Sequence, residues 1–250
     1  MKIISFFLTV IVLAFAMQVS AKDTASLLEE LDRTLADGRK YTAMTQAGIN
    51  SLKASLAQAR TDEQRYEIIG KLREAYRSFD IDSALYFANE KLAVARRIGR
   101  HEYMSDAYMN MAEMSGVQGM YKEALDLIDK VDKVGMTVYQ IEYYYHVYRI
   151  IYGLMADNCS NEAAKKRYLE MTDKYRDSIL LVNTPGTFNY LIVKADKYNV
   201  YNRYDEAIKM LKDAYPEYKG IHEKALLDYS LAMSYAGKGD VENEIGRAHV

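Results

Sequence analysis

The segment YQIEYYYHVYRIIY, residues 139–152, gathers most of the side chains that could recognise a ligand. Tyr144, Tyr148 and Tyr152 follow one another at four-residue spacing, so they share one stripe of a helix, where packing is the expected role. Aromatic and hydroxyl-bearing side chains off that stripe suit the binding of a peptide or a small molecule. These candidate partner-binding residues are Tyr139, Tyr143, Tyr145 and His146. Packing of the whole cluster is the alternative interpretation.

Side chains that could perform catalysis are scattered along the chain. No histidine has a second His, a Cys or a paired carboxylate at metal-ligand spacing on one helical face; the four are His101, His146, His222 and His249. Cys159 is the only cysteine, and we interpret it as a small packed residue rather than a nucleophile. Nucleotide-binding, hydrolase, metalloprotease and kinase motifs are absent from the sequence. We therefore predict that the protein is not an enzyme and uses no cofactor or metal.

Composition excludes further classes of partner. The net charge is −2, which gives the chain no attraction for nucleic acid or for an anionic lipid surface. Tyrosine is abundant, with 23 Tyr against 6 Phe and no Trp, and this favours a thin structure in which ring hydroxyls reach a wet boundary. Pro185 and Pro216 are the only prolines, so long helices are permitted almost everywhere.

Helices are the elements expected to position these side chains. The segments Ser26–Ala36 and Ile49–Ala59 have the apolar spacing of helices, and no segment sustains the alternation of a strand. The residue pattern of Ala107–Val131 recurs in Leu191–Ala214, so the chain contains a repeat. The repeat has an alanine anchor in each copy, at spacings of 40, 40 and 43 residues: Ala84, Ala124, Ala164 and Ala207. Such a period predicts stacked helical hairpins rather than one closed core.

The two best copies indicate how each hairpin closes. Ala112 faces Ala124 in the first copy and Ala195 faces Ala207 in the second, and small residues let antiparallel helices approach closely. The residues suited to a left-handed turn between the helices are Gly119 and Asn202. We predict an all-α fold, a right-handed αα-solenoid of about 11 helices, counted at two helices per repeat.

This pattern resembles the tetratricopeptide repeat (TPR), which has a small residue early in its second helix and an aromatic residue three positions earlier. Tyr121 and Ala124 fit this pattern, and so do Tyr204 and Ala207. Lys91 departs from it, because an apolar residue is expected at that position. The spacing exceeds the TPR period of about 34 residues, which predicts lengthened helices or loops.

Residues 1–21 have the features of a secretory signal peptide. Lys2 precedes the apolar segment Ile3–Met17, and Val19–Ala21 provides the small residues of a cleavage site. An uncleaved anchor is the alternative, although the apolar segment is shorter than the roughly 20 residues that a membrane span needs. We predict an exported, periplasmic protein with an N-terminal helical segment at 22–60 and a TPR-like solenoid at 61–244.

The chain ends in IGRAHV, residues 245–250, close to the place where the second helix of a fifth hairpin should begin. We interpret these residues as a translated sequencing adapter, a non-native tail, and expect the natural protein to continue beyond residue 243. Without a following helix, Leu227, Leu231 and Tyr235 are expected to be partly exposed.

Five further segments are LLEELDRTL, INSLKASL, FDIDSALYFANEKL, YRDSIL and GTFNYLIVKADKY. They resemble a family of exported helical-repeat regulators from Bacteroidetes that carry a domain of unknown function. The resemblance implies the periplasmic sensor half of a truncated signalling protein, with a membrane span, a coiled coil and a DNA-binding end beyond this sequence. A soluble periplasmic scaffold is the alternative.

We expect a protein or peptide ligand on the concave face of the solenoid and no nucleic acid for this fragment. Membrane contact is expected only through the signal peptide or a missing C-terminal span.

Overall fold

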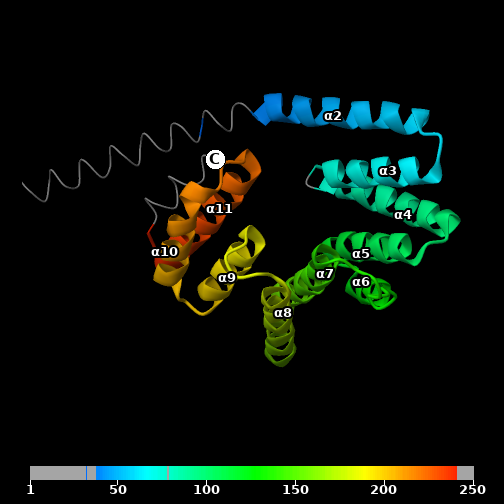
Figure 1. Cartoon of the computed structure of the whole chain (residues 1–250). Helices are drawn as coiled ribbons and strands as arrows, with labels where there is room; N and C mark the ends of the chain where they lie inside the picture. The colour runs from blue at the N-terminus through cyan, green and yellow to red at the C-terminus, as the bar shows by residue number, and fades with distance from the viewer. Residues whose placement is uncertain (1–31, 33–37, 78, 241–250) are drawn as a thin grey trace, which may run out of the picture. The chain divides into compact units, whose positions relative to one another are not determined.

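A computed structural model describes residues 32, 38–77 and 79–240 of the chain. These residues form ten α-helices and one short 3₁₀ turn, and they contain no strand (Figure 1). None of these helices combines the length and the apolar character that crossing a membrane requires. The segments predicted as signal peptide and as a non-native tail lie outside the described residues, and so does the predicted helix at Ser26–Ala36 apart from residue 32.

The helices are α2 (Gly38–Gln58), α3 (Asp62–Arg77), α4 (Ile81–Ile98), α5 (His101–Val117), α6 (Tyr121–Ile128), α7 (Val138–Asp157), α8 (Glu162–Val182), α9 (Phe188–Val200), α10 (Tyr204–Ala214) and α11 (Ile221–Lys238), with the 3₁₀ turn η1 (Tyr215–Glu217) after α10. They fall into two compact units. The first unit is Thr42–Val193, and the second contains the described residues 38–41 and 194–240.

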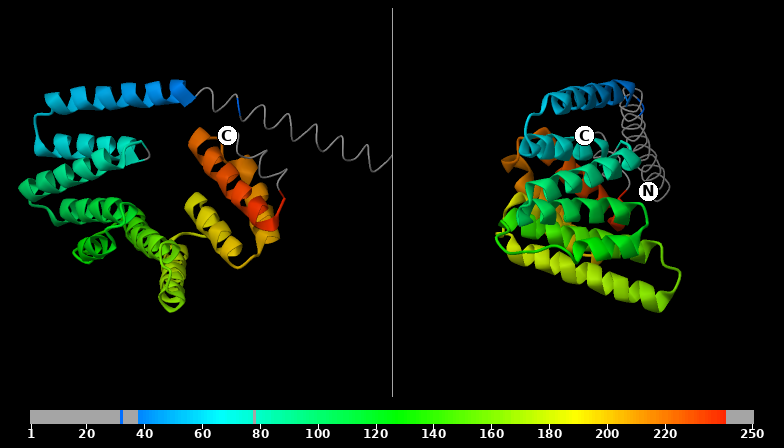
Figure 2. Two further views of the ribbon diagram at one scale, coloured as in Figure 1. Left: turned by 180° about the vertical axis from the view of Figure 1, so that it is seen from behind. Right: turned by 90° about the vertical axis from the view of Figure 1, so that its right-hand side faces the viewer.

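The first unit is a stack of helical hairpins. Within it α3 packs on α4, α4 on α5, α5 on both α6 and α7, and α7 on α8. The right-hand view of Figure 2 shows these hairpins as successive layers from α3 to α8. Each hairpin contacts its neighbours in the stack, so the predicted all-α solenoid is confirmed.

The turns between helices lie where the sequence placed them. The helix α5 ends at Val117, Gly119 has φ +82°, and α6 begins at Tyr121. Asn202 has φ +56° before α10, and it is the one non-glycine residue with positive φ in the described part of the chain. Both residues predicted for left-handed turns therefore adopt that conformation.

Three of the four alanine anchors are completely buried. Ala84, Ala124 and Ala207 are each the fourth residue of their helix and have no exposed surface. Ala164 differs from the other three anchors, because it is half-buried. Because α8 begins at Glu162, this alanine lies one position earlier in its helix than the other anchors do, directly beside the helix cap formed by Asn161.

The repeat spacing exceeds the TPR period because helices and a loop are lengthened, as expected. The helices α7 and α8 are long, with 20 and 21 residues. The helix α6 has only 8 residues, and a connection at 129–137 follows it. The third hairpin therefore lengthens its helices, whereas the second lengthens its loop.

The second unit corrects one expectation about the end of the chain. Leu227, Leu231 and Tyr235 on α11 are buried rather than partly exposed. The preceding helix α10 packs against α11, and a Cβ added at Gly237 would lie only 2.3 Å from a ring carbon of Tyr204. The packing of α10 on α11 therefore contributes to the burial of this apolar stripe.

Close helix packing at Gly116 gives a stability prediction. A Cβ at Gly116 would lie 2.9 Å from Ile151 Cγ1, because α5 and α7 cross tightly there. The variant Gly116→Ala should lower the free energy of unfolding by about 1–3 kcal/mol through overpacking, although alanine favours a helix. The control Gly48→Ala on α2 meets no atom within 4 Å and should raise it by about 0.5–1 kcal/mol. Urea denaturation measures both, and shifts in the same direction would contradict the role given to Gly116.

Candidate functional site

The first helices of the three hairpins are α3, α5 and α7, and we call the surface that they share the first-helix face. Tyr66, Asp106 and His146 lie 40 residues apart and therefore occupy equivalent positions on these helices. The Tyr66 hydroxyl donates to Asp106 Oδ2 at 2.5 Å, and the backbone oxygen of Tyr103 lies 3.0 Å from the same hydroxyl as a second acceptor for its one proton. Equivalent positions of neighbouring hairpins are thus joined directly by side chains.

Lys91 comes from α4 and reaches between α3 and α5. Its ammonium donates to Asp106 Oδ2 at 2.6 Å and to Asn110 Oδ1 at 2.9 Å, and it lies 4.5 Å from the centre of the Tyr66 ring. The residue is only 8% exposed, so the carboxylate and the ring replace much of its hydration. This set of partners is the physical reason for the departure of Lys91 from the TPR pattern.

Glu113 is the most deeply buried carboxylate of the face, at 1% exposure. It accepts hydrogen bonds from Arg73 at 3.1 Å, from Arg77 at 2.5 Å and from the Tyr143 hydroxyl at 2.6 Å. Asn110 donates to the same hydroxyl at 3.5 Å and so links Glu113 to the Lys91 group. We call this connected set the polar network: Tyr66, Arg73, Arg77, Lys91, Asp106, Asn110, Glu113 and Tyr143.

The tyrosines of the polar network are neutral donors at physiological pH. Burial, reinforced by the charge of Asp106, raises the pKa of Tyr66 far above its ordinary value. Burial and then the charge of Glu113 raise the pKa of Tyr143 in the same way. Each hydroxyl therefore keeps its proton and donates it in a hydrogen bond to a carboxylate of a neighbouring hairpin.

A pocket of about 250 Å³ opens on the first-helix face. Its floor is formed by the buried Tyr66 and Lys91 and the half-buried Asp106, and Gly70 leaves room above the Lys91 ammonium. The exposed side chains at its rim are Glu67, Lys71 and Glu74. We call this the Lys91 pocket; it joins the polar network to solvent.

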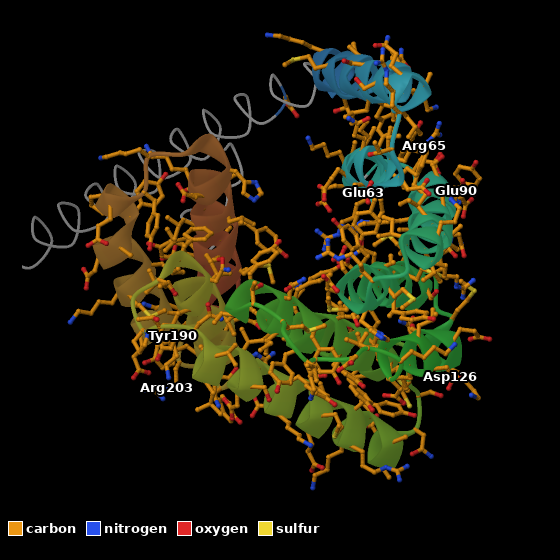
Figure 3. The ribbon with its side chains drawn as sticks, turned by 45° about the vertical axis from the view of Figure 1, so that its right-hand side comes forward. Glu63, Arg65, Glu90, Asp126, Tyr190 and Arg203 are labelled. Carbon is orange, nitrogen blue, oxygen red and sulfur yellow. The ribbon has the colours of Figure 1, made fainter. Side chains whose placement is uncertain are left out.

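A second hollow lies between α4, α5 and α6. It measures about 400 Å³, and its lining includes four apolar side chains: Leu85, Met111, Met120 and Leu127. In Figure 3, Glu90 of α4 and Asp126 of α6 are labelled along this edge. No part of the polar network lines this hollow, so the first-helix face is the stronger candidate site.

The structure separates the four predicted site residues. Tyr139 is 72% exposed and lies one helical turn before Tyr143, whose hydroxyl is committed to Glu113. His146 is half-buried, at the position equivalent to Asp106, and its Nδ1 lies 3.4 Å from Arg149 Nη2. Tyr139, Tyr143 and His146 thus belong to the first-helix face, with Tyr139 the most accessible of them.

Tyr145 belongs instead to an aromatic cluster between α7 and α8. Its ring centre lies 5.4 Å from that of Tyr144 and 6.2 Å from that of Tyr175. Tyr148 is buried in the same cluster, stacks on Tyr175 at 4.5 Å and donates to Asp129 at 2.6 Å, so its predicted core role is confirmed. Burial raises the pKa of Tyr175 to about 12. Tyr145 therefore packs against the rings of this cluster and does not belong to the first-helix face.

Sequence reasoning missed Lys91, Asp106, Asn110 and Glu113 as site residues. A usable signal was present, because Tyr66 with Asp106 and Arg73 with Glu113 are complementary pairs at the repeat spacing of 40 residues. In the sequence, Lys91 is distinguished only by its departure from the TPR pattern. Over the described ranges, no group of three His, Cys, Asp or Glu side chains could hold a metal ion.

Comparison with protein families identifies one match. A family model described as the SusR N-terminal TPR domain matches residues 35–247, which spans every helix from α2 to α11. No curated protein sequence matches the chain. The TPR-like pattern seen in the repeats is therefore shared with a recognised domain family over most of the chain.

The buried carboxylate of Glu113 gives a second stability prediction. The variant Glu113→Gln removes the buried carboxylate that Arg73 and Arg77 share, leaving the exposed Glu74 as their remaining charge partner, and should lower the free energy of unfolding by about 3 kcal/mol. The control Glu102→Gln removes an exposed partner of Arg100 and should change it by less than about 0.5 kcal/mol. Equal urea midpoints for the two variants would show that Glu113 does not hold the hairpins together.

Proposed function

Because the chain belongs to the SusR N-terminal TPR domain family, we propose that its first-helix face binds a protein or peptide and forms the sensing part of an exported regulator. TPR-type domains are in general scaffolds for protein binding or sensing rather than catalysts. The observation that carries the proposal is the Lys91 pocket, which opens on the face that such solenoids turn toward their partners. Tyr139 on the same face adds an exposed aromatic contact.

The polar network supports recognition rather than catalysis. Its carboxylates accept hydrogen bonds from Arg, Lys and Tyr side chains of the same network. These hydrogen bonds stabilise the ionised form of each carboxylate. Because its charged groups are already paired, the network holds the pocket in place before a ligand arrives. We therefore assign the protein a binding role and no reaction.

The exported setting rests on the sequence of the N-terminus. Lys2, the apolar segment Ile3–Met17 and the cleavage-site residues support secretion to the periplasm. A membrane-spanning regulator would then carry the bound state across the inner membrane through a segment beyond residue 243. The alternative is a soluble periplasmic scaffold, which needs no such segment.

A sequence determination separates these two proposals. The uninterrupted gene should encode an apolar segment of about 20 residues downstream of residue 243 if the protein is a membrane-spanning regulator. Intact-mass measurement of the envelope fraction should find a chain that begins at Lys22. A gene without the apolar segment would leave the soluble scaffold, and a retained Met1 would contradict the cleaved signal peptide.

Binding at the first-helix face can be tested with two exposed tyrosines. Peptides selected from a random display library against the full chain should bind Tyr139→Ala about tenfold more weakly, because an exposed aromatic contact is lost. Tyr86→Ala on α4 is the matched control, since Tyr86 is 59% exposed and lies on a second helix. Isothermal titration measures affinity, and thermal melting should be nearly unchanged for both variants. Equal loss of affinity in the two variants, or none in either, would contradict the proposed face.

A further inference from the structure

The floor of the Lys91 pocket presents a hydrogen-bond donor and an acceptor side by side. An ammonium has three N–H groups, and Lys91 uses two of them, on Asp106 Oδ2 and on Asn110. Asp106 Oδ2 accepts from both Tyr66 and Lys91, and no hydrogen bond within the described ranges reaches its other oxygen, Oδ1. One N–H of Lys91 and Oδ1 of Asp106 therefore remain for a ligand.

The charges of the pocket favour a neutral ligand group. Lys91 and Asp106 already form an ion pair at 2.6 Å. A carboxylate would approach Lys91 but also face Asp106 and the rim carboxylates of Glu67 and Glu74. An ammonium would approach Asp106 but face Lys91 and the rim ammonium of Lys71. A group with one donor and one acceptor satisfies both floor atoms without a like-charge contact.

We propose that the Lys91 pocket binds the side-chain carboxamide of a glutamine or asparagine residue in the partner peptide. The carboxamide oxygen accepts from the free N–H of Lys91, and its NH₂ group donates to Asp106 Oδ1. The pocket volume of about 250 Å³ is below the range of roughly 300–1,000 Å³ found for drug-sized ligands, so it suits a single side chain. This inference rests on the proposed peptide-binding function and adds its chemical selectivity.

Gly70 controls access to the floor. A Cβ at this position would lie 3.2 Å from Lys91 Nζ and 3.4 Å from Lys91 Cε, inside the space that a carboxamide would use. Glycine inside a helix costs stability relative to alanine, so an open pocket accounts for its presence in the middle of α3. The same substitution at Gly48, where no atom lies within 4 Å, provides a matched control.

The test uses four capped amino acids that differ only in the side chain: the N-acetyl N-methylamides of glutamine, glutamate, lysine and methionine. Each is titrated into the full chain at pH 7, and binding is followed by the backbone amide resonances of Gly70 and Lys71. The glutamine probe should shift these resonances at millimolar concentration, and the other three should bind at least fivefold more weakly. Gly70→Ala should weaken the glutamine probe at least tenfold, whereas Gly48→Ala should leave it unchanged, with both variants folded by thermal melting.

Several outcomes would overturn the inference. Preference for the glutamate or lysine probe, no shift with the glutamine probe, or full binding to Gly70→Ala would each show that the pocket does not select a carboxamide. If selected peptides still lose affinity in Tyr139→Ala, peptide binding stands and only the selectivity fails. If the glutamine probe binds as expected but no peptide binds the first-helix face, the pocket stands and the wider peptide-binding function fails.

Discussion

The buried carboxylate of Glu113 is the contact on which the first unit depends most. In a solenoid each hairpin touches only its neighbours, so no closed core ties distant hairpins together. Glu113 lies on the middle hairpin, receives Arg73 and Arg77 from the hairpin before it, and receives Tyr143 from the hairpin after it. One side chain thus connects three successive hairpins. Because Glu113 is buried, separating it from its partners would leave an unpaired buried charge, which costs much free energy.

Tyrosine side chains also connect neighbouring elements at other places in the first unit. Tyr66 donates to Asp106, Tyr143 to Glu113 and Tyr148 to Asp129, and each carboxylate lies on a different element from its tyrosine. The ring fills the groove between helices while the hydroxyl donates a hydrogen bond to a carboxylate of a neighbouring element. Phenylalanine could fill the same groove but could not hold the acid. The high tyrosine content therefore reflects paired carboxylates as well as wet boundaries.

The fold could be predicted from the sequence because its signals are local. Helical apolar spacing, Gly119 and Asn202 at left-handed turns, and buried alanines at Ala84, Ala124 and Ala207 each depend on a few adjacent residues. Ala164 is less buried than the other anchors because α8 begins two residues before it rather than three, which the repeat spacing alone does not reveal.

The site was harder to predict because its contacts join residues far apart in the sequence. The bond between Tyr143 and Glu113 spans 30 residues, and the bond between Arg73 and Glu113 spans 40. Tyr139, Tyr143, Tyr145 and His146 were grouped by sequence proximity, yet Tyr145 turns toward α8 and Tyr143 is taken up by the network. The Lys91 pocket also depends on a missing side chain at Gly70, which a search for reactive residue types does not notice.

The equivalent positions of Arg73 and Glu113 in successive hairpins also constrain how such a domain can evolve. A tandem duplication of α5 and α6 would set Glu113 opposite its own copy, and two buried carboxylates without an arginine repel each other. Deletion of the same hairpin would set Arg73 opposite Gly153, the residue 40 positions after Glu113, and leave the buried guanidinium with only the exposed Glu74 as an acid partner. Whole-repeat gain or loss, the usual route by which solenoids change length, is therefore disfavoured at this point of the chain and easier between hairpins whose facing residues are apolar.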